Sequence, residues 1–332
     1  MRASPAPFAL SQSDKQRELW YNIAVDMTEL PDVASGDGVE QSIFGHWIGL
    51  RGRLTRSYWG WMGIVAVLCG ALASNHLEWD GEHLLGLGLV LVLVELGWGS
   101  LWDLAVGTDW FRPLAEDWPP SRFASLPALP YTQPRSPGGR IARGLGRLAA
   151  WWREAFWPLH GPALLGLLAA VILTAVLALL LPARLRPLHA TLVALIGLGM
   201  VQRRRGRQPL AGMAVTQVGL GWLAGYAVLA EVEPVPVILA LVYSLAAWGG
   251  LRIVAGASRG LWLLNGGQVL GAVVLVAVKQ PLAAGIAGLF LFGQVAMQPA
   301  LRHGDRGPQA VLGRRLWPWL MAAMLVAARV VP

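Results

Sequence analysis

The chain has 332 residues, of which 55% are hydrophobic and only 14% are charged. A soluble chain of this length would be expected to form about two domains with a far more polar composition. The apolar residues instead come in runs of about 20, the length that crosses a hydrocarbon core. Because helices satisfy their own backbone hydrogen bonds in lipid, the composition indicates an all-α, multi-pass membrane protein.

The net charge of +8 raises the question of a nucleic-acid partner. Most Lys and Arg residues, however, lie in short loops beside the apolar runs, where they set topology and meet anionic lipid. We therefore expect contacts with the membrane and with lipid, and no nucleic acid. The single cysteine, Cys69, excludes a disulfide framework and a thiolate metal cluster.

Residues 1–57 form a mostly polar segment ahead of the first apolar run. We expect this segment to be cytoplasmic and to approach the membrane through an amphipathic stretch, in which Ile43 and Trp47 are followed by Arg51. Residues 58–331 are expected to form one transmembrane helical bundle.

The apolar runs predict nine membrane helices in this bundle. Prolines open five of them, at the position where a missing backbone N–H costs nothing. The fourth run is short for a full crossing. The predicted spans are 58–75, 83–106, 162–181, 187–201, 209–230, 234–254, 261–278, 281–297 and 315–331.

The basic residues predict how these helices are oriented. With the amino terminus inside and the carboxyl terminus outside, the Lys and Arg residues fall inside, with four exceptions. This is the bias of the positive-inside rule, as expected in a cytoplasmic-type or equivalent energy-transducing membrane. The exceptions are Arg184, Arg186, Lys279 and Arg329.

The longest inside loop, 107–161, has two parts. As far as Pro137 it is rich in proline and reads as irregular. Beyond that point apolar residues recur at helical spacing, with arginines between them, as in a helix lying in the membrane surface. We expect an in-plane helix on the cytoplasmic side, and favour an anchoring role over a gate. Its apolar face comprises Ile141, Leu145, Leu148, Trp152 and Phe156, and its arginines are Arg140, Arg143, Arg147 and Arg153.

The second apolar run leads into an acidic stretch interleaved with tryptophans. Carboxylates at the mouth of a membrane helix cost insertion energy, and a function is the usual reason for them. They are candidate ligands for Mg²⁺, and through the metal ion for a diphosphate. The alternative is a plain helix end at the headgroups, because tryptophans form interfacial belts. The carboxylates are Asp103, Asp109, Glu116 and Asp117.

Arginines in two further inside loops are candidate phosphate ligands, because a guanidinium binds phosphate oxygens in pairs. Topology and lipid headgroups are the competing explanation. Within the second run, Glu95 is a candidate buried polar group, with Arg252 considered as its partner. The loop arginines are Arg203, Arg204, Arg205, Arg207, Arg252 and Arg259.

Motifs of several enzyme classes are missing from the chain, among them the P-loop, HExxH and GxSxG. The six histidines lie mostly at the ends of predicted helices, where we assign them structural roles.

The stretch MVQRRRGRQPLAGMAVTQVGLGWLAGYAVLA, together with the nine spans, resembles the UbiA superfamily of membrane prenyltransferases. The resemblance covers about residues 58–331. It implies a basic loop between helices four and five, and two aspartate motifs that bind Mg²⁺ and the diphosphate of an isoprenoid donor. Asp103 and Asp109 fall where the first motif is expected, although their spacing differs. The place of the second motif holds Arg252 and Arg259 in place of carboxylates.

Three functions follow from these observations. The missing second motif favours a non-catalytic protein that binds an isoprenoid or another lipid-tailed molecule, as an accessory or assembly factor of a larger membrane complex. The acidic stretch favours the alternative, a Mg²⁺-dependent prenyl or lipid-phosphate transferase with an altered site. The third hypothesis, a transporter, rests on the helix count and Glu95.

Overall fold

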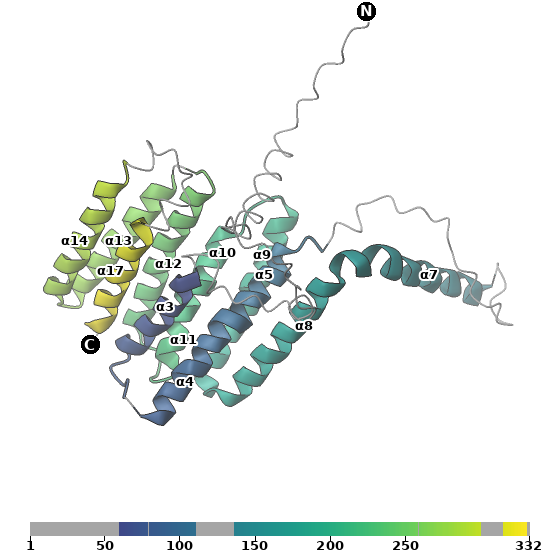
Figure 1. Cartoon of the computed structure of the whole chain (residues 1–332), viewed down its shortest axis with the longest axis horizontal. Coiled ribbons are helices and arrows are strands. Elements are labelled where there is room, and N and C mark those ends of the chain that lie inside the picture. Colours follow the sequence, from purple (N-terminus) through teal and green to yellow (C-terminus); the bar gives the residue numbers. More distant parts are fainter. Residues whose placement is uncertain (1–59, 79, 111–135, 258, 300–314, 331–332) are drawn as a thin grey trace, which may run out of the picture.

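The computed structural model describes residues 60–78, 80–110, 136–257, 259–299 and 315–330, and every regular element in them is helical (Figure 1). Five of these helices are long and apolar enough to cross a membrane. The chain is therefore a multi-pass, all-α integral membrane protein. The five are Gly81–Gly107, Pro137–Leu180, Ala183–Arg204, Pro234–Val254 and Gly260–Ala277.

The first half of the described chain contains two helices that are continuous through π-helical segments. In each, the hydrogen-bonding pattern widens for one turn while the helix goes on. The elements are α3 (Gly60–Ala73), α4 (Gly81–Val92), η2 (Leu93–Trp98), α5 (Gly99–Gly107), α7 (Pro137–Trp151), η3 (Trp152–Phe156), α8 (Trp157–Leu180), η4 (Ala183–Leu185) and α9 (Arg186–Arg204).

The second half begins with another helix that is interrupted by a π segment. Each of the nine predicted spans coincides with a helical segment of the described residues. This confirms nine helices there, and five of the helical stretches are long and apolar enough to cross a membrane. The remaining elements are α10 (Leu210–Ala214), η5 (Val215–Leu220), α11 (Gly221–Ala227), α12 (Pro234–Val254), α13 (Gly260–Ala277), α14 (Pro281–Met297) and α17 (Trp317–Arg329).

One predicted boundary differs from the structure by more than a few residues. Proline favours the first turn of a helix, so the third span was expected to open at Pro162. Pro162 instead lies inside α8, which begins at Trp157 and continues without a break from α7 through η3. Interior prolines are tolerated in membrane helices, where neighbouring helices and local π adjustments satisfy the freed backbone groups.

The short helix α3 is a centre of the bundle and packs against α11, α17, η2 and η5. Its crossing with α11 brings backbone against backbone. A Cβ built at Gly70 would lie 1.8 Å from the carbonyl oxygen of Trp222, and one at Gly225 would lie 2.0 Å from that of Val67. Small residues permit this approach, which is how membrane helices gain packing energy without a hydrophobic driving force between them.

Hydrogen bonds and ring contacts join the helices of the second half. The Tyr243 hydroxyl of α12 donates to the carbonyl of Ala323 in α17 at 3.1 Å, and its ring stacks on Trp222. Between α13 and α14, Gln268 Nε2 donates to Gln294 Oε1 at 2.8 Å, and both side chains are buried. Buried amides that bond across helices in this way stabilise membrane bundles.

Replacing Gly225 by Ala should destabilise the bundle, because the added methyl would meet the Val67 carbonyl and force α3 and α11 apart. Overpacking of this kind costs about 1–3 kcal/mol. The control is Gly88→Ala on α4, where a Cβ would meet nothing within 4 Å. Unfolding of both variants in bicelles measures the difference; equal stability of the two would contradict the close crossing.

Candidate functional site

The acidic end of the second span is a helix terminus. The helix α5 ends at Gly107, and Thr108 has an extended backbone with ψ 134°. The helix therefore stops between Asp103 and Asp109, both of which are exposed. Trp110 folds back, and its indole Nε1 donates to the carbonyl of Ala105 at 3.0 Å. Glu116 and Asp117, the other two candidate ligands, lie outside the described residues.

A buried tryptophan joins this helix end to α9 and α10. The ring of Trp102 lies where two glycines leave room for it. A Cβ at Gly212 would be 2.4 Å from its Cη2 atom, and a Cβ at Gly199 would be 3.2 Å from that atom. Val106, one turn further along α5, also lies against Gly199. The end of α5 is thus fixed against the last turns of α9.

The arginine loop, Arg203–Arg207, reverses the chain between α9 and α10. Gly206 has φ +69°, a backbone conformation that glycine adopts without strain. The Arg207 N–H donates to the carbonyl of Gln202 at 2.9 Å and closes the turn. Arg204, Arg205 and Arg207 are exposed, while Arg203 is half-buried.

The acidic and basic candidates therefore come to the same end of the bundle. Val106 contacts Gly199, and from that contact both Asp109 and Arg203 lie about one helical turn further along their chains. The sequence placed both on inside loops but gave no sign that α5 and α9 are neighbours. The helix α9 packs against both α5 and α10, which places the three elements together.

A pocket of about 120 Å³ opens between α9 and α10, next to the arginine loop. Its wall is mostly apolar, and Gln202 supplies the one side-chain amide among its lining residues. The side chain of Leu198, on the rim, is 55% exposed, so the pocket faces the outside of the bundle. Its lining includes Leu198, Gly199, Gln202, Ala211 and Gly212.

Arg252 and Arg259 flank the turn between α12 and α13. Arg252 belongs to the last turn of α12 and lies 5.8 Å from the centroid of the Trp248 ring, a cation–π arrangement. Arg259 is exposed at the start of α13. A short turn joins α11 to α12, so α12 returns antiparallel and packs against α10. The end of α12 and its arginines therefore lie at the same end as the arginine loop.

Glu95 is buried in η2, with 6% of its surface exposed. Its carboxyl group lies against α3, where a Cβ at Gly63 would be 2.1 Å from Oε1. The segment η2 packs against α3, α4, α5 and α8, whereas Arg252 is on α12 against Trp248. Burial of Glu95 was expected from the sequence; its position on a π turn was not, because a π turn has no distinct composition.

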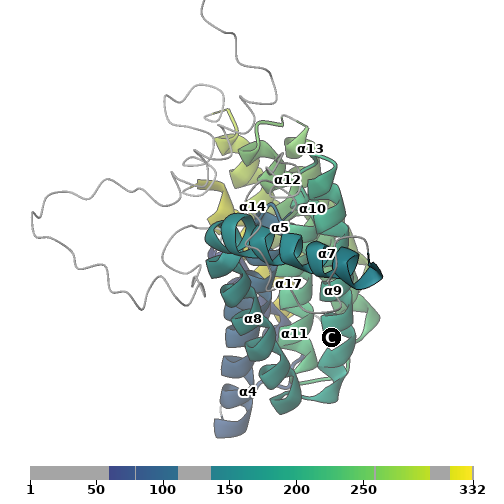
Figure 2. The same ribbon diagram turned by 90° about the vertical axis from the view of Figure 1, so that its right-hand side faces the viewer.

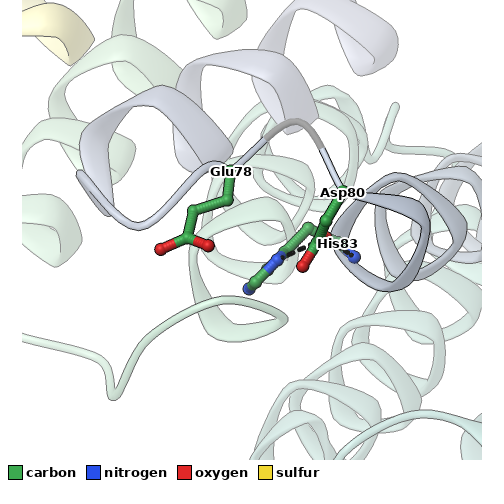
Figure 3. A group of neighbouring side chains, drawn as sticks. All are labelled: Glu78, Asp80 and His83. Carbon is green, nitrogen blue, oxygen red and sulfur yellow. Dashed lines mark hydrogen bonds and ion pairs between the residues drawn. The ribbon is translucent and has the colours of Figure 1, made fainter.

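Sequence reasoning missed one cluster, at the start of α4. One atom each from Glu78, Asp80 and His83 lies within 4.8 Å of the others (Figure 3). Two carboxylates and an imidazole suit a divalent metal ion. Helix capping already accounts for part of this geometry, because Asp80 Oδ1 accepts from the His83 N–H at 2.8 Å and lies 2.7 Å from Nδ1. An Asp three residues before a His at a helix start was the available signal.

No known protein family, curated protein or solved structure matches this chain. The fold and the site place it in the class of multi-pass helical membrane proteins, and the finer resemblance to prenyltransferases rests on the residues quoted from the sequence.

Asp80 should stabilise the start of α4 at neutral pH and cease to do so in acid. Hydrogen bonds from His83 lower the pKa of the Asp80 carboxyl below its usual range. A lowered pKa in the folded state gives stability that is present above the unfolded-state pKa and is lost as the pH falls through the folded-state value. Asp80→Ala should therefore lower the melting temperature at neutral pH and leave it almost unchanged well below the carboxyl range. An equal effect at both would contradict the capping role.

Proposed function

We propose that the protein binds an isoprenoid or another lipid-tailed molecule without transferring it, as an accessory or assembly factor of a larger membrane complex. The observation that carries the proposal is the apolar α9–α10 pocket beside the arginine loop. A lipid with an anionic headgroup needs both features, an apolar surface for its tail and cations for its phosphate.

The chemistry of the two parts supports this assignment. Arg205 and Arg207 are exposed at the rim of the bundle, where a guanidinium can bind phosphate oxygens with two parallel hydrogen bonds. The pocket is small, so it suits the first carbons of a chain that continues along the lipid-facing side of α9. The charge bias along the sequence supports an orientation in which this end and the amino terminus are inside.

The second candidate is a Mg²⁺-dependent prenyl or lipid-phosphate transferase with a UbiA-like bundle. It is favoured by the packing of the acidic end of α5 against α9, which puts Asp109 and Arg203 at one end. Departure of a diphosphate requires neutralisation of its charge, commonly by metal ions. The turn between α12 and α13 offers Arg252 and Arg259, which carry charge but ligate no metal.

Filling the pocket should weaken lipid binding. Ala211 lines the pocket on α10, so Ala211→Leu would occupy its volume. Neutralising Arg205 and Arg207 to Gln should reduce the affinity by at least about tenfold, since each hydrogen bond between charged groups contributes about 1.5–3 kcal/mol. The probe is a labelled isoprenyl diphosphate, titrated onto the purified protein in nanodiscs.

The matched control is Ala190→Leu, the same substitution at an exposed position of α9. It should bind the probe as the wild type does. Equal affinity of wild type, Ala211→Leu and the double Gln variant would show that neither the pocket nor the arginine loop binds the probe.

The same probe separates binding from catalysis. In the transferase, Asp103 and Asp109 hold a divalent ion that neutralises the donor phosphate, so Asp103→Asn and Asp109→Asn should lower Mg²⁺-dependent binding by orders of magnitude. In the binding protein, both variants retain the affinity of the wild type and Mg²⁺ has little effect. We expect the second result. Tight binding that requires Mg²⁺ and is lost in both variants would contradict the binding protein and support the transferase site instead.

A further inference from the structure

The helix α7 presents an apolar face that the described part of the bundle leaves exposed. The side chains of Ile141, Leu145 and Leu148 are 64%, 60% and 57% exposed, and Trp152, which follows in η3, is 40% exposed. Their spacing of three and four residues places all four on one side of the helix. Large apolar side chains grouped in this way mark a surface that something apolar covers.

The other sides of α7 are basic. Arg140 and Arg147 are exposed and project away from the apolar face, and Arg153 follows in η3. The segment Pro137–Trp151 contains no acidic residue, and the first one after it is the exposed Glu154, next to Arg153 in η3. A helix with one apolar face and arginines on the rest has the composition of helices that lie at a membrane surface.

The position of α7 is set by the membrane helix that it joins. The chain runs as one helix from Pro137 to Leu180, and its α8 part also exposes large apolar side chains near the junction, among them Leu159 at 48% and Leu168 at 50%. The exposed apolar surface of α8 thus continues toward α7. Figures 1 and 2 show α7 leaving the top of α8 and running across the direction of the bundle helices.

An aromatic cluster surrounds the bend between α7 and α8. Phe156 stacks on Trp152 with ring centroids 4.6 Å apart, and its ring also lies 5.3 Å from that of His160. Trp110, which follows α5, lies 5.5 Å from the His160 ring. The bend is therefore packed against the end of α5. Tryptophan side chains, of which this cluster contains two, are enriched at the level of the lipid headgroups.

We propose that α7 lies in the plane of the membrane, with its apolar face in the outer acyl region of one leaflet and its arginines on the phosphates of anionic lipids. Continuity with α8 fixes the depth of α7, and its exposed apolar face matches hydrocarbon. Arginines without acidic residues between Pro137 and Trp151 match a negatively charged surface. The apolar face of α7 is thus covered by the lipid itself. This assignment extends the proposed function and does not rest on the α9–α10 pocket.

Spin labels on the two sides of α7 test the proposal. The background is the full chain with Cys69→Ala, which removes the single, buried cysteine. Labels are attached to Leu148→Cys on the apolar face and, as the control, to Ala150→Cys on the opposite side. In vesicles that contain phosphatidylglycerol, the label at 148 should collide with oxygen and be shielded from a water-soluble nickel complex. The label at 150 should be open to the nickel complex.

Two other patterns would overturn the assignment. Equal access of the nickel complex to both labels would place α7 in water. Shielding of the label at 148 from both oxygen and nickel would mean that protein covers the face, either a segment of this chain or a second copy. Melting curves of both labelled variants, compared with the unlabelled background, verify that the bundle is intact.

A further variant tests whether the arginines of α7 bind anionic lipid. Arg140→Gln with Arg147→Gln should reduce the contrast between the two labels in anionic vesicles, and vesicles of phosphatidylcholine alone should reduce it to a similar extent. A contrast that is the same in both lipids and in both variants would show that lipid charge has no part in the binding of α7.

Discussion

The crossing of α3 and α11 constrains the rest of the bundle. Gly70 and Gly225 allow the two backbones to touch, so the position of α3 is defined by main-chain atoms that cannot move aside as a side chain can. The same short helix packs against α17, η5 and η2, and its Gly63 lies against the carboxyl group of Glu95. Close packing of this kind must supply the stability that apolar burial supplies in water, because lipid is as apolar as a leucine side chain. Helices of both halves of the chain are consequently placed relative to α3.

Local signals explain how far the sequence predicted the fold. The prolines at 234 and 281 open α12 and α14 where they were expected, because proline disfavours the interior of a helix and suits its first turn. The apolar runs predicted the other helices to within a few residues. The π segments could not be predicted in this way. A widened turn such as η2 or η5 depends on contacts with other helices and has the composition of its surroundings.

The arrangement of the candidate site could be predicted from the sequence less well than the helices could. Asp103 and Arg203 are each evident in the sequence as charges near the end of an apolar run, but their relative position depends on which helices pack together. That depends on Trp102, whose ring fits against Gly199 and Gly212 on two other helices. Each of these residues is unremarkable by itself: a tryptophan near an interface, and glycines in apolar runs. Only the three-dimensional arrangement shows that small residues on α9 and α10 create the space that the ring occupies.

The two ends of the bundle use their cations differently. At the end where α3 joins α4, Arg184 donates to the carbonyl of Val228 at 2.7 Å, and Lys279 adopts φ +62° in the turn that closes α13. Arg329 lies in the last turn of α17, where the helix dipole favours positive charge. Three of the four exceptions to the charge bias thus lie at helix ends or in turns, and the fourth, Arg186, begins α9.

At the opposite end, cations are numerous and several are exposed, as Arg205, Arg207 and Arg259 are. Exposed guanidinium groups beside apolar helix surfaces find their natural partners in the phosphates of the adjoining leaflet. The arginine loop and α7 would then meet the same anionic surface from two parts of the chain. The charge asymmetry that the positive-inside rule predicts to orient the protein during insertion would, in the folded bundle, also provide the surface that binds anionic lipid.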